Sequence, residues 1–436
     1  MRGVLKRGDE SPGETVFIRN FGCPSSLVDA GFMERALIGA GYRISDNPAS
    51  ADFLIYNTCG VKTPTEDRII GLMKNVPKTK HLLITGCLPV INLERLRKEV
   101  NFSGISGPST GPEIVNILSR VKRGLKVTEL RTAWKLEPLL PNPRSGQLIS
   151  IIPVAYGCLS SCSYCCVKTA RGRLRSYPIE EIATRLRGDV EKGSREFWLT
   201  GQDVGCYGHD LGTSLTELLD RISRIDGKFR VRVGMMNPEH LVKIQDELVE
   251  AFKSEKIFKF LHIPVQSGDD GILEYMNRAY SVEDIKQIVL AFRERIKRIT
   301  IATDIIYGFP GENREAFENT IQLLRELKPD VLNISRFSAR PRTPLSEARR
   351  VPPHEEKRRS RTLTDLSREI ALTQNRGWIG WKGEALIDEI GKGDSWIGRN
   401  HAYRPVAIRD ERNLLGKFVN VRICEAAPTY LMGKTL

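Results

Sequence analysis

Residues Gly157-Cys158-Leu159-Ser160-Ser161-Cys162-Ser163-Tyr164-Cys165 are the most informative stretch of this chain, with three cysteines spaced C-x3-C-x2-C. Three thiolates on one tight loop can hold three irons of a 4Fe–4S cluster and leave the fourth iron without a protein ligand. A structural zinc site would need four ligands, usually from paired C-x2-C knuckles, and no second knuckle follows. A disulfide bond or a chance spacing could also bring cysteines this close in the sequence. The stretch nevertheless favours a cluster whose open iron can bind a cofactor or substrate.

The composition is that of a globular chain with a basic excess. The 436 residues suffice for two or three domains, and the net charge of +14 favours a polyanionic partner, most commonly RNA. A cationic surface without a partner is the alternative. Residues 1–14 lack the apolar segment of a signal peptide, and residues 145–167 are too rich in Ser, Gly, Pro and Cys for a membrane span, so we expect a cytoplasmic protein. Nine cysteines in such a chain indicate metal or redox chemistry.

The N-terminal region alternates strand-like and helix-like patterns, which predicts an α/β domain of the flavodoxin-like type, with a parallel sheet covered by helices on both faces. The proline-containing residues 126–147 are predicted to be a linker. The apolar runs 15–19, 53–57 and 81–85 are the expected strands, and 26–41, 65–75 and 93–100 the expected helices.

The same alternation recurs in residues 148–336, with the cysteine loop after the first strand. Six β/α units are too few to close an eight-stranded barrel, so we expect an incomplete (β/α)6 barrel with a lateral mouth for a large substrate. The predicted strands are 148–155, 196–200, 230–235, 258–265, 299–307 and 331–337, and the predicted helices 179–192, 215–225, 239–253, 281–297 and 314–327.

The remaining chain is predicted to be a charged connector (338–376) and a small antiparallel β-barrel (377–436). A solvated helix is the alternative for the connector. Strand-like runs at 384–390, 403–408 and 417–423, separated by Gly-containing turns, indicate the barrel. Three of the five tryptophans lie in it. Aromatic side chains on a basic barrel can stack RNA bases, but any single one is more commonly a core residue.

Three further cysteines, Cys23, Cys59 and Cys87, each follow one of the N-terminal strands. The carboxyl ends of parallel strands share one edge of the sheet, where open α/β folds bind ligands. We therefore expect these thiols to converge on a second cluster with one open iron. Three unrelated buried cysteines are the alternative.

At this point the chain resembles the radical S-adenosylmethionine methylthiotransferases. Residues 15–125 resemble the family's auxiliary-cluster domain through Asn57-Thr58-Cys59 and Thr85-Gly86-Cys87. Residues 148–376 resemble its radical domain, and residues 377–436 the RNA-binding TRAM domain, an OB-like barrel. The radical-domain motifs are the cysteine loop, Leu199-Thr200-Gly201-Gln202-Asp203, the run from His262 to Gly268 and the run from Asp304 to Glu312.

One branch of the family fits best. The segments following Cys59 (Val61 to Asp67) and following the radical loop (Val167 to Gly172) are similar to the archaeal and eukaryotic branch, which acts on N6-threonylcarbamoyladenosine at position 37 of tRNA. Isopentenyladenosine in tRNA and an aspartate of a ribosomal protein are the alternative substrates. An RNA-binding protein with structural clusters is the non-enzymatic alternative. Ser26, Gly31 and Gly60 depart from the family pattern around the N-terminal cluster.

The resemblance implies a transferase with two 4Fe–4S clusters and S-adenosylmethionine, acting at adenine C2. Its partners would be the anticodon loop of tRNA, an electron donor protein and a sulfur donor. His262 is expected to be a satisfied barrel histidine, and Cys166, Cys206 and Cys424 to be structural. The implied metal ligands are Cys23, Cys59, Cys87, Cys158, Cys162 and Cys165, and the implied cofactor contacts are Thr200, Gly201, Gln202, Gln266, Ser267 and Phe309.

Overall fold

The computed structural model describes residues 13–130, 136–140, 146–393 and 395–436. The chain divides into two compact units. One comprises Met1–Glu137 with Thr169–Arg171, and the other comprises Pro138–Lys168 with Gly172–Leu436. The three residues Thr169–Arg171 therefore belong to the first unit, although in the sequence they closely follow the cysteine loop of residues 157–165. That loop is called the radical cysteine loop below, after the domain that it resembles.

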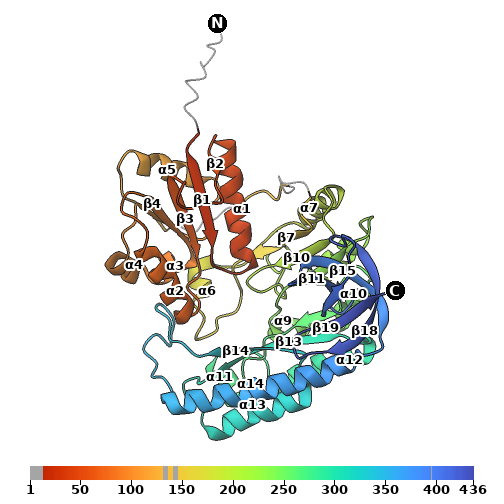
Figure 1. The fold of residues 1–436 in the computed structure, drawn as a ribbon. Helices are drawn as coiled ribbons and strands as arrows, with labels where there is room; N and C mark the ends of the chain where they lie inside the picture. Colours follow the sequence, from red (N-terminus) through yellow and green to blue (C-terminus); the bar gives the residue numbers. More distant parts are fainter. Residues whose placement is uncertain (1–12, 131–135, 141–145, 394) are drawn as a thin grey trace. The chain divides into compact units, whose positions relative to one another are not determined.

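The first unit is built on a six-stranded parallel sheet with strand order β2-β1-β3-β4-β5-β6. This order is that of a flavodoxin-like sheet with one added strand. Figure 1 labels its strands β1 to β4. The strands are β1 (Thr15–Asn20), β2 (Arg43–Ile44), β3 (Phe53–Thr58), β4 (His81–Gly86), β5 (Gly104–Ser106) and β6 (Val127–Glu129), and the helices are α1 (Pro24–Gly39), α2 (Thr63–Lys74), α3 (Cys87–Ile91), α4 (Leu93–Glu99) and α5 (Glu113–Lys122).

Alternating side chains of the central strands build a core on each face of this sheet. Phe53 and Ile55 pack with α1 and α5, whereas Leu54 and Tyr56 pack with α2, α3 and α4. The period of two that defines a strand thus assigns successive residues to opposite layers. The linker prediction is wrong at its start, because Val127–Glu129 forms the edge strand β6 and Val127 is fully buried. The segments 131–135 and 141–145 of that prediction lie outside the described residues.

The second unit begins with an open parallel barrel made of two three-stranded sheets, β11-β10-β7 and β12-β13-β14. The sheets meet where Val231 forms a parallel bridge with Ile257. In the described residues β7 and β14 do not pair, so the barrel is incomplete, as predicted. The strands are β7 (Ile149–Pro153), β10 (Glu196–Thr200), β11 (Arg230–Val233), β12 (Phe260–His262), β13 (Thr300–Tyr307) and β14 (Val331–Arg336).

Polar residues fix where several barrel helices begin. Ser214, Ser281 and Asn313 are N-caps whose side chains accept hydrogen bonds from backbone N–H groups of the first turn. The helix predicted over 239–253 is instead two shorter helices, α9 and α10. The helices are α7 (Ile179–Glu191), α8 (Leu215–Ser223), α9 (Pro238–Leu241), α10 (Gln245–Phe252), α11 (Asp270–Tyr275), α12 (Val282–Arg295) and α13 (Arg314–Leu327).

The charged connector contains a long helix, α14 (Pro353–Arg376), which lies along α13 in Figure 1. Its inner face is buried, with Leu363 and Leu366 at its middle. It is not merely solvated, because Arg359 is only 4% exposed and pairs with Glu312 beside the barrel.

A closed five-stranded barrel ends the chain, in the order β15-β16-β17-β19-β18. The neighbouring pairs are antiparallel except β17 with β19, which is parallel. Its core contains Trp378, Ile387, Val406, Ile408 and Val421. Strands β16 and β19 lie outside the predicted runs. The strands are β15 (Lys382–Ile390), β16 (Ser395–Asn400), β17 (Pro405–Arg409), β18 (Phe418–Ala426) and β19 (Leu431–Thr435).

The closed barrel packs against the amino-terminal ends of the parallel strands. The Tyr403 hydroxyl donates to Glu196, the first residue of β10, at 3.1 Å. The Tyr403 ring lies 4.8 Å from that of Phe258, and Arg404 forms a buried ion pair with Asp330. Because the radical cysteine loop follows β7, it lies at the opposite, carboxyl-terminal end of the strands. Among the described residues, no helix is both long and apolar enough to cross a membrane.

Candidate functional site

The radical cysteine loop leaves the barrel through a glycine that the backbone requires. Gly157 has φ of 77°, and a Cβ at this position would lie 2.0 Å from the Arg173 carbonyl oxygen. No side chain fits there. The loop follows β8 (Ala155–Tyr156), which pairs with β9 (Arg175–Ser176), so its two ends are held together, and it leads into α6 (Val167–Arg171).

Polar side chains brace the segment between Cys158 and Cys162. The Lys168 ammonium donates to the carbonyls of Leu159 and Ser160 at 2.9 and 3.1 Å and to the Ser161 hydroxyl at 3.0 Å. The side-chain amide of Asn237, the N-cap of α9, donates to the Ser160 hydroxyl at 2.8 Å. The loop is therefore preorganised by groups outside the cysteines themselves, which is what a multi-thiol site needs.

The three radical-loop cysteines are partly exposed and have unlike electrostatic environments. A hydrogen bond with Cys206 lowers the pKa of Cys158 to about 7, whereas burial raises the pKa of Cys162 to about 11 and also raises that of Cys165. Sequence reasoning treats Cys206 as structural and misses its contact with Cys158, because the residues are 48 positions apart in the chain.

Cys206 also belongs to a small cluster with Asp203 and His240, whose potential ligand atoms lie within 4.8 Å of one another. The cluster has the donor types of a metal site. However, Asp203 Oδ1 already accepts from the backbone N–H groups of Gly205 and Asn237 at 2.9 and 3.0 Å. Shaping of the loop after β10 accounts for these contacts without a metal.

The first group of expected cofactor contacts lies at the carboxyl end of β10. Thr200 ends the strand and Gly201 follows it, so both lie at the carboxyl end of the barrel. The Gln202 side-chain oxygen accepts from the Gly157 N–H at 2.6 Å. Gln202 therefore supports the start of the cysteine loop, and its contact with a cofactor stays a prediction.

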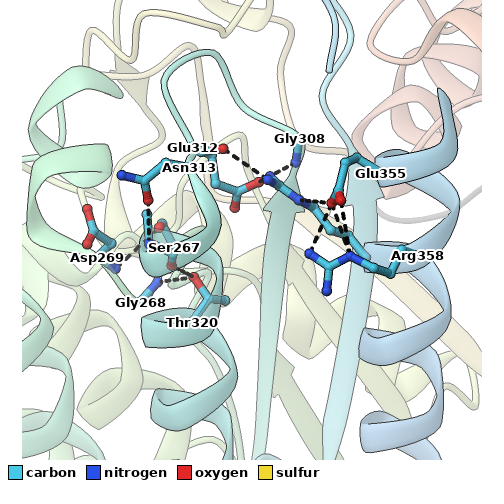
Figure 2. Close-up of polar contacts among 11 residues, drawn as sticks. Ser267, Gly268, Asp269, Gly308, Glu312, Asn313, Thr320, Glu355 and Arg358 are labelled. Atoms are coloured by element: carbon cyan, nitrogen blue, oxygen red, sulfur yellow. Dashed lines mark hydrogen bonds and ion pairs between the residues drawn. The ribbon is translucent and has the colours of Figure 1, made fainter. Parts of the chain in front are cut away.

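The second group follows β12 and is tightly bound into the fold (Figure 2). Gln266 has φ of 70° and forms a parallel bridge with Ile305. Ser267 is 1% exposed, and its hydroxyl accepts from the Asp269 N–H at 3.3 Å. The next N–H, of Gly268, donates to the Thr320 hydroxyl at 2.9 Å. His262 is paired with Asp304 at 2.9 Å.

Phe309 is a core residue in this structure. It is fully buried and packs edge-on against Tyr164 of the cysteine loop at 5.9 Å. The turn around it is held by Glu312, which accepts from the Gly308 N–H at 2.6 Å (Figure 2). Glu312 also pairs with Arg359 of α14. Any cofactor contact here would come from backbone groups, and it stays a prediction.

In the first unit, adjacent strands place Cys59 and Cys87 in equivalent positions. Thr58 is in register with Gly86, and the two cysteines are the next residues along β3 and β4. Cys23 follows β1 and is the N-cap of α1. A Cβ on its neighbour Gly22 would lie 3.9 Å from the Cys59 Cβ. The strand-end arrangement expected from the sequence is therefore present, and the ligand roles stay a prediction.

The three positions around the N-terminal cysteines that depart from the family pattern, Ser26, Gly31 and Gly60, have different surroundings in the structure. The Ser26 hydroxyl donates to the Cys23 carbonyl at 2.7 Å, so this side chain holds the first turn of α1. The Asn57 amide donates to Asn20 Oδ1 at 2.8 Å and to the Ser26 backbone carbonyl at 2.7 Å, which ties the ends of β1 and β3 to that turn. A Cβ on Gly60 would lie 3.0 Å from the Leu88 Cα, so a larger residue would crowd α3. Open space surrounds Gly31, and nothing in the structure explains that departure.

Cys87 lies against a buried ion pair that sequence reasoning misses. Arg171 and Asp29, each 2% exposed, are joined at 2.7 Å within the first unit. Burial raises the pKa of Cys87 to about 11, and a hydrogen bond and the positive charge of Arg171 oppose that rise. A guanidinium donating to a thiol is suited to a thiolate ligand.

The C-terminal barrel carries a row of exposed cations on three adjacent strands. Arg422 of β18 is in register with Lys382 of β15 and with Lys434 of β19. Among the described residues, none of the three forms an ion pair. Like charges directly opposite one another destabilise a sheet, so this row favours an anionic partner.

The donor sets fit the group that the sequence predicts. Each cysteine set offers three thiols on a preorganised edge or loop, which is the donor chemistry of a 4Fe–4S cluster with one open iron. Cys158, Cys162 and Cys165 would hold one such group and Cys23, Cys59 and Cys87 another.

Models of three protein families match the chain. The Radical SAM superfamily matches residues 152–324, the uncharacterized protein family UPF0004 matches residues 15–106, and the TRAM domain matches residues 380–436. The matched segments follow one another in the order expected from the resemblance.

Curated relatives match almost the full chain. A probable threonylcarbamoyladenosine tRNA methylthiotransferase of Archaeoglobus fulgidus is 41% identical over 96% of this chain and 98% of that protein. The probable enzyme of Pyrococcus horikoshii is 38% identical over 97% of this chain and 99% of that protein. A threonylcarbamoyladenosine tRNA methylthiotransferase of Xenopus laevis is 34% identical over 97% of this chain and 77% of that protein.

Solved structures share the fold. The radical S-adenosylmethionine methyltransferase TsrM from Kitasatospora setae, solved with cobalamin and a 4Fe–4S cluster, superposes with a TM-score of 0.57 at 16% identity, covering 77% of this chain and 74% of that one. The cobalamin-dependent radical enzyme OxsB has a TM-score of 0.50 at 11% identity, covering 83% of this chain and 56% of that one. At these identities the likeness concerns the fold alone.

Proposed function

The chain belongs to the threonylcarbamoyladenosine tRNA methylthiotransferases, a family of radical S-adenosylmethionine enzymes, and we propose that it inserts a methylthio group at adenine C2 of N6-threonylcarbamoyladenosine-37 in tRNA. The observation that carries this proposal is the identity of 34–41% to enzymes of that name over nearly the full chain. The basic excess and the C-terminal TRAM domain support an RNA substrate.

The two cysteine sets divide the chemistry. A 4Fe–4S cluster with S-adenosylmethionine supplies a radical that can remove the hydrogen at adenine C2, which is too weakly acidic for a base to remove. Cys158, Cys162 and Cys165 would hold that cluster. Cys23, Cys59 and Cys87 would hold a second one, which would supply the sulfur to be inserted, and a second S-adenosylmethionine would supply the methyl group. An electron donor protein and a sulfur donor complete the proposed set of partners.

The protein's own residues bind, orient and shield the reacting groups. Lys168 and Asn237 hold the radical loop in shape, and Gln202 fixes its start. Thr200, Gly201, Gln266, Ser267 and the backbone at Phe309 line the carboxyl edge where the cofactor would lie. Adenosine-37 must leave its stack to reach this edge, so base flipping from the anticodon loop is expected. The cation row Lys382, Arg422 and Lys434 would contact phosphates.

Mass spectrometry of tRNA nucleosides tests the reaction. Reconstituted enzyme, incubated with S-adenosylmethionine, a reductant and tRNA carrying threonylcarbamoyladenosine, is expected to yield the 2-methylthio nucleoside. Side-by-side reactions with isopentenyladenosine tRNA and with ribosomal protein should give none. Product from either of these, in preference to the first, would refute the substrate assignment while leaving the radical chemistry in place.

Variants of each cysteine set test the division of roles. Replacing Cys158, Cys162 and Cys165 by Ala should remove about half of the bound iron and all cleavage of S-adenosylmethionine, since one of two equal clusters is lost. Replacing Cys23, Cys59 and Cys87 should also halve the iron, but should leave some cleavage and no methylthio product. Full product formation by the second variant would show that those three thiols carry no sulfur.

A further inference from the structure

The last residue of α11 and the residues after it run along the radical cysteine loop. The carbonyls of Tyr275 and Met276 accept from the hydroxyl and the N–H of Ser163 at 2.8 and 3.0 Å. The Asn277 side chain donates to the Ser161 carbonyl at 2.7 Å. The Asn277 backbone has φ of 56°, which turns the chain so that the next side chain also faces the loop.

That next residue is Arg278, whose guanidinium is fixed in one orientation. It donates to the Tyr164 hydroxyl at 3.0 Å and to Asn237 Oδ1 at 3.0 Å. Its charged carbon lies 5.5 Å from the centre of the Tyr280 ring. Tyr164 stands between Cys162 and Cys165 in the sequence, so the guanidinium is held at the thiol-bearing part of the loop.

Among the residues that the structure describes, no carboxylate forms an ion pair with Arg278. Its Nε is buried and has no hydrogen-bond acceptor. Asp203 contributes to the field at Arg278, but its own contacts are with Gly205, Asn237 and His240. Arg278 is thus a half-buried cation that no carboxylate of the described residues contacts directly, and a cation in this setting favours an anion placed beside it.

We propose that Arg278 is the counter-cation of the radical iron–sulfur cluster and raises its reduction potential. The inference rests on the proposed placement of that cluster on Cys158, Cys162 and Cys165. Three thiolates make the cluster anionic, and reduction adds one further negative charge. A fixed cation beside the thiolates stabilises the reduced state more than the oxidised state. Arg278 is thus a positioning residue that acts through the cluster's charge.

The test is a potentiometric titration of the reconstituted full-length protein, followed by electron paramagnetic resonance in the absence of tRNA. The radical cluster is identified as the signal that changes when S-adenosylmethionine is added. In Arg278→Met the ratio of reduced to oxidised cluster at a fixed potential should fall about tenfold, which is a shift of about 59 mV to more negative values. Arg278→Lys keeps the charge and should restore most of the potential. Arg224→Met, which removes an exposed cation of the same unit, is the matched control.

An unchanged potential in an iron-replete Arg278→Met protein overturns the proposal. So does an unchanged potential combined with weaker binding of S-adenosylmethionine, which would assign Arg278 to the cofactor's carboxylate. If Arg278→Met does not retain the cluster, Tyr164→Phe decides. It removes one anchor of the guanidinium without a charge change, and a smaller shift in the same direction is expected, whereas no shift refutes the idea. None of these outcomes depends on nucleoside analysis, so the substrate assignment is tested separately.

Discussion

At the residue scale, Lys168 shows how a side chain outside the cysteine spacing fixes the shape of a cysteine loop. Its ammonium satisfies three acceptors between Cys158 and Cys162. A charged donor to backbone carbonyls contributes more than a neutral one. The same lysine belongs to the segment that resembles one branch of the family, so a residue that marks the branch also has a structural task.

Lys168→Met should therefore loosen the radical loop. We expect iron to leave this protein for a chelator about tenfold faster than from the native protein, because roughly 1–2 kcal/mol of hydrogen bonding is lost. Cleavage of S-adenosylmethionine should fall with the iron. Lys243→Met, at an exposed position of the same unit, serves as the control. Iron release at the native rate would mean that the three hydrogen bonds do not hold the loop.

Arg171 has the corresponding role beside Cys87. Arg171→Met would leave the buried Asp29 carboxylate without this guanidinium, and we expect a loss of stability on the order of 3 kcal/mol. Adding Asp29→Asn removes the uncompensated charge and should recover part of the loss. Denaturant unfolding of the two single variants and the double variant measures the coupling. Additive losses would show that the two groups do not stabilise each other.

At the scale of elements, the closed barrel and the parallel barrel share a buried acid. Burial, followed by the charge of Asp388, raises the pKa of Glu196 from 4.5 to about 7. Tyr403 and Trp198 donate to one of its oxygens, while the other is buried without a partner. The neutral carboxyl therefore suits this contact between β10 and the loop before β17.

This contact should make stability depend on pH. Between about pH 4.5 and 7 the folded chain keeps the Glu196 proton and the unfolded chain does not, so stability falls as pH rises through that window. Glu196→Gln is always neutral. The free energy of unfolding of this variant, compared with that of the native protein, should rise by on the order of 2 kcal/mol between pH 5 and pH 8. Thermal unfolding at both pH values is the measurement, with the exposed Glu217→Gln as control. If the stability of the native protein and that of Glu196→Gln changed in parallel with pH, the prediction would be wrong.

The sequence pattern predicts the long elements, but it misses the short strands and the contacts between residues that are far apart in the sequence. Strand β10 and helix α13 have the predicted bounds, because each is bordered by clear capping or turn residues. Strands β5 and β6 have three residues each, too few for a period of two to emerge. The cysteines are evident from their spacing. Arg171 and Arg278 are not, because their partners lie more than 100 positions away or in another element, and no local pattern records such contacts.

At the scale of the whole molecule, removing residues 377–436 is a poor test of RNA binding. It would expose Phe258 and leave Asp330 without Arg404, because the two barrels share a buried interface within one compact unit. Loss of binding after such a truncation would then report damage to the parallel barrel as well as loss of an RNA contact. Point changes on the outer face of the closed barrel avoid this problem.

The cation row offers those changes. Replacing Lys382, Arg422 and Lys434 by Gln should weaken tRNA binding and lower the slope of log affinity against log salt by about two to three, since each phosphate contact contributes roughly 0.7–0.9 to that slope. Cleavage of S-adenosylmethionine without tRNA should not change, because all three side chains lie on the closed barrel, away from both cysteine sets in the sequence. Glu389→Gln on the same barrel is the control for a general surface effect. Weaker binding with an unchanged salt slope would indicate that the three side chains contact the tRNA without neutralising its phosphates. An unchanged affinity would place the tRNA on another face of the protein.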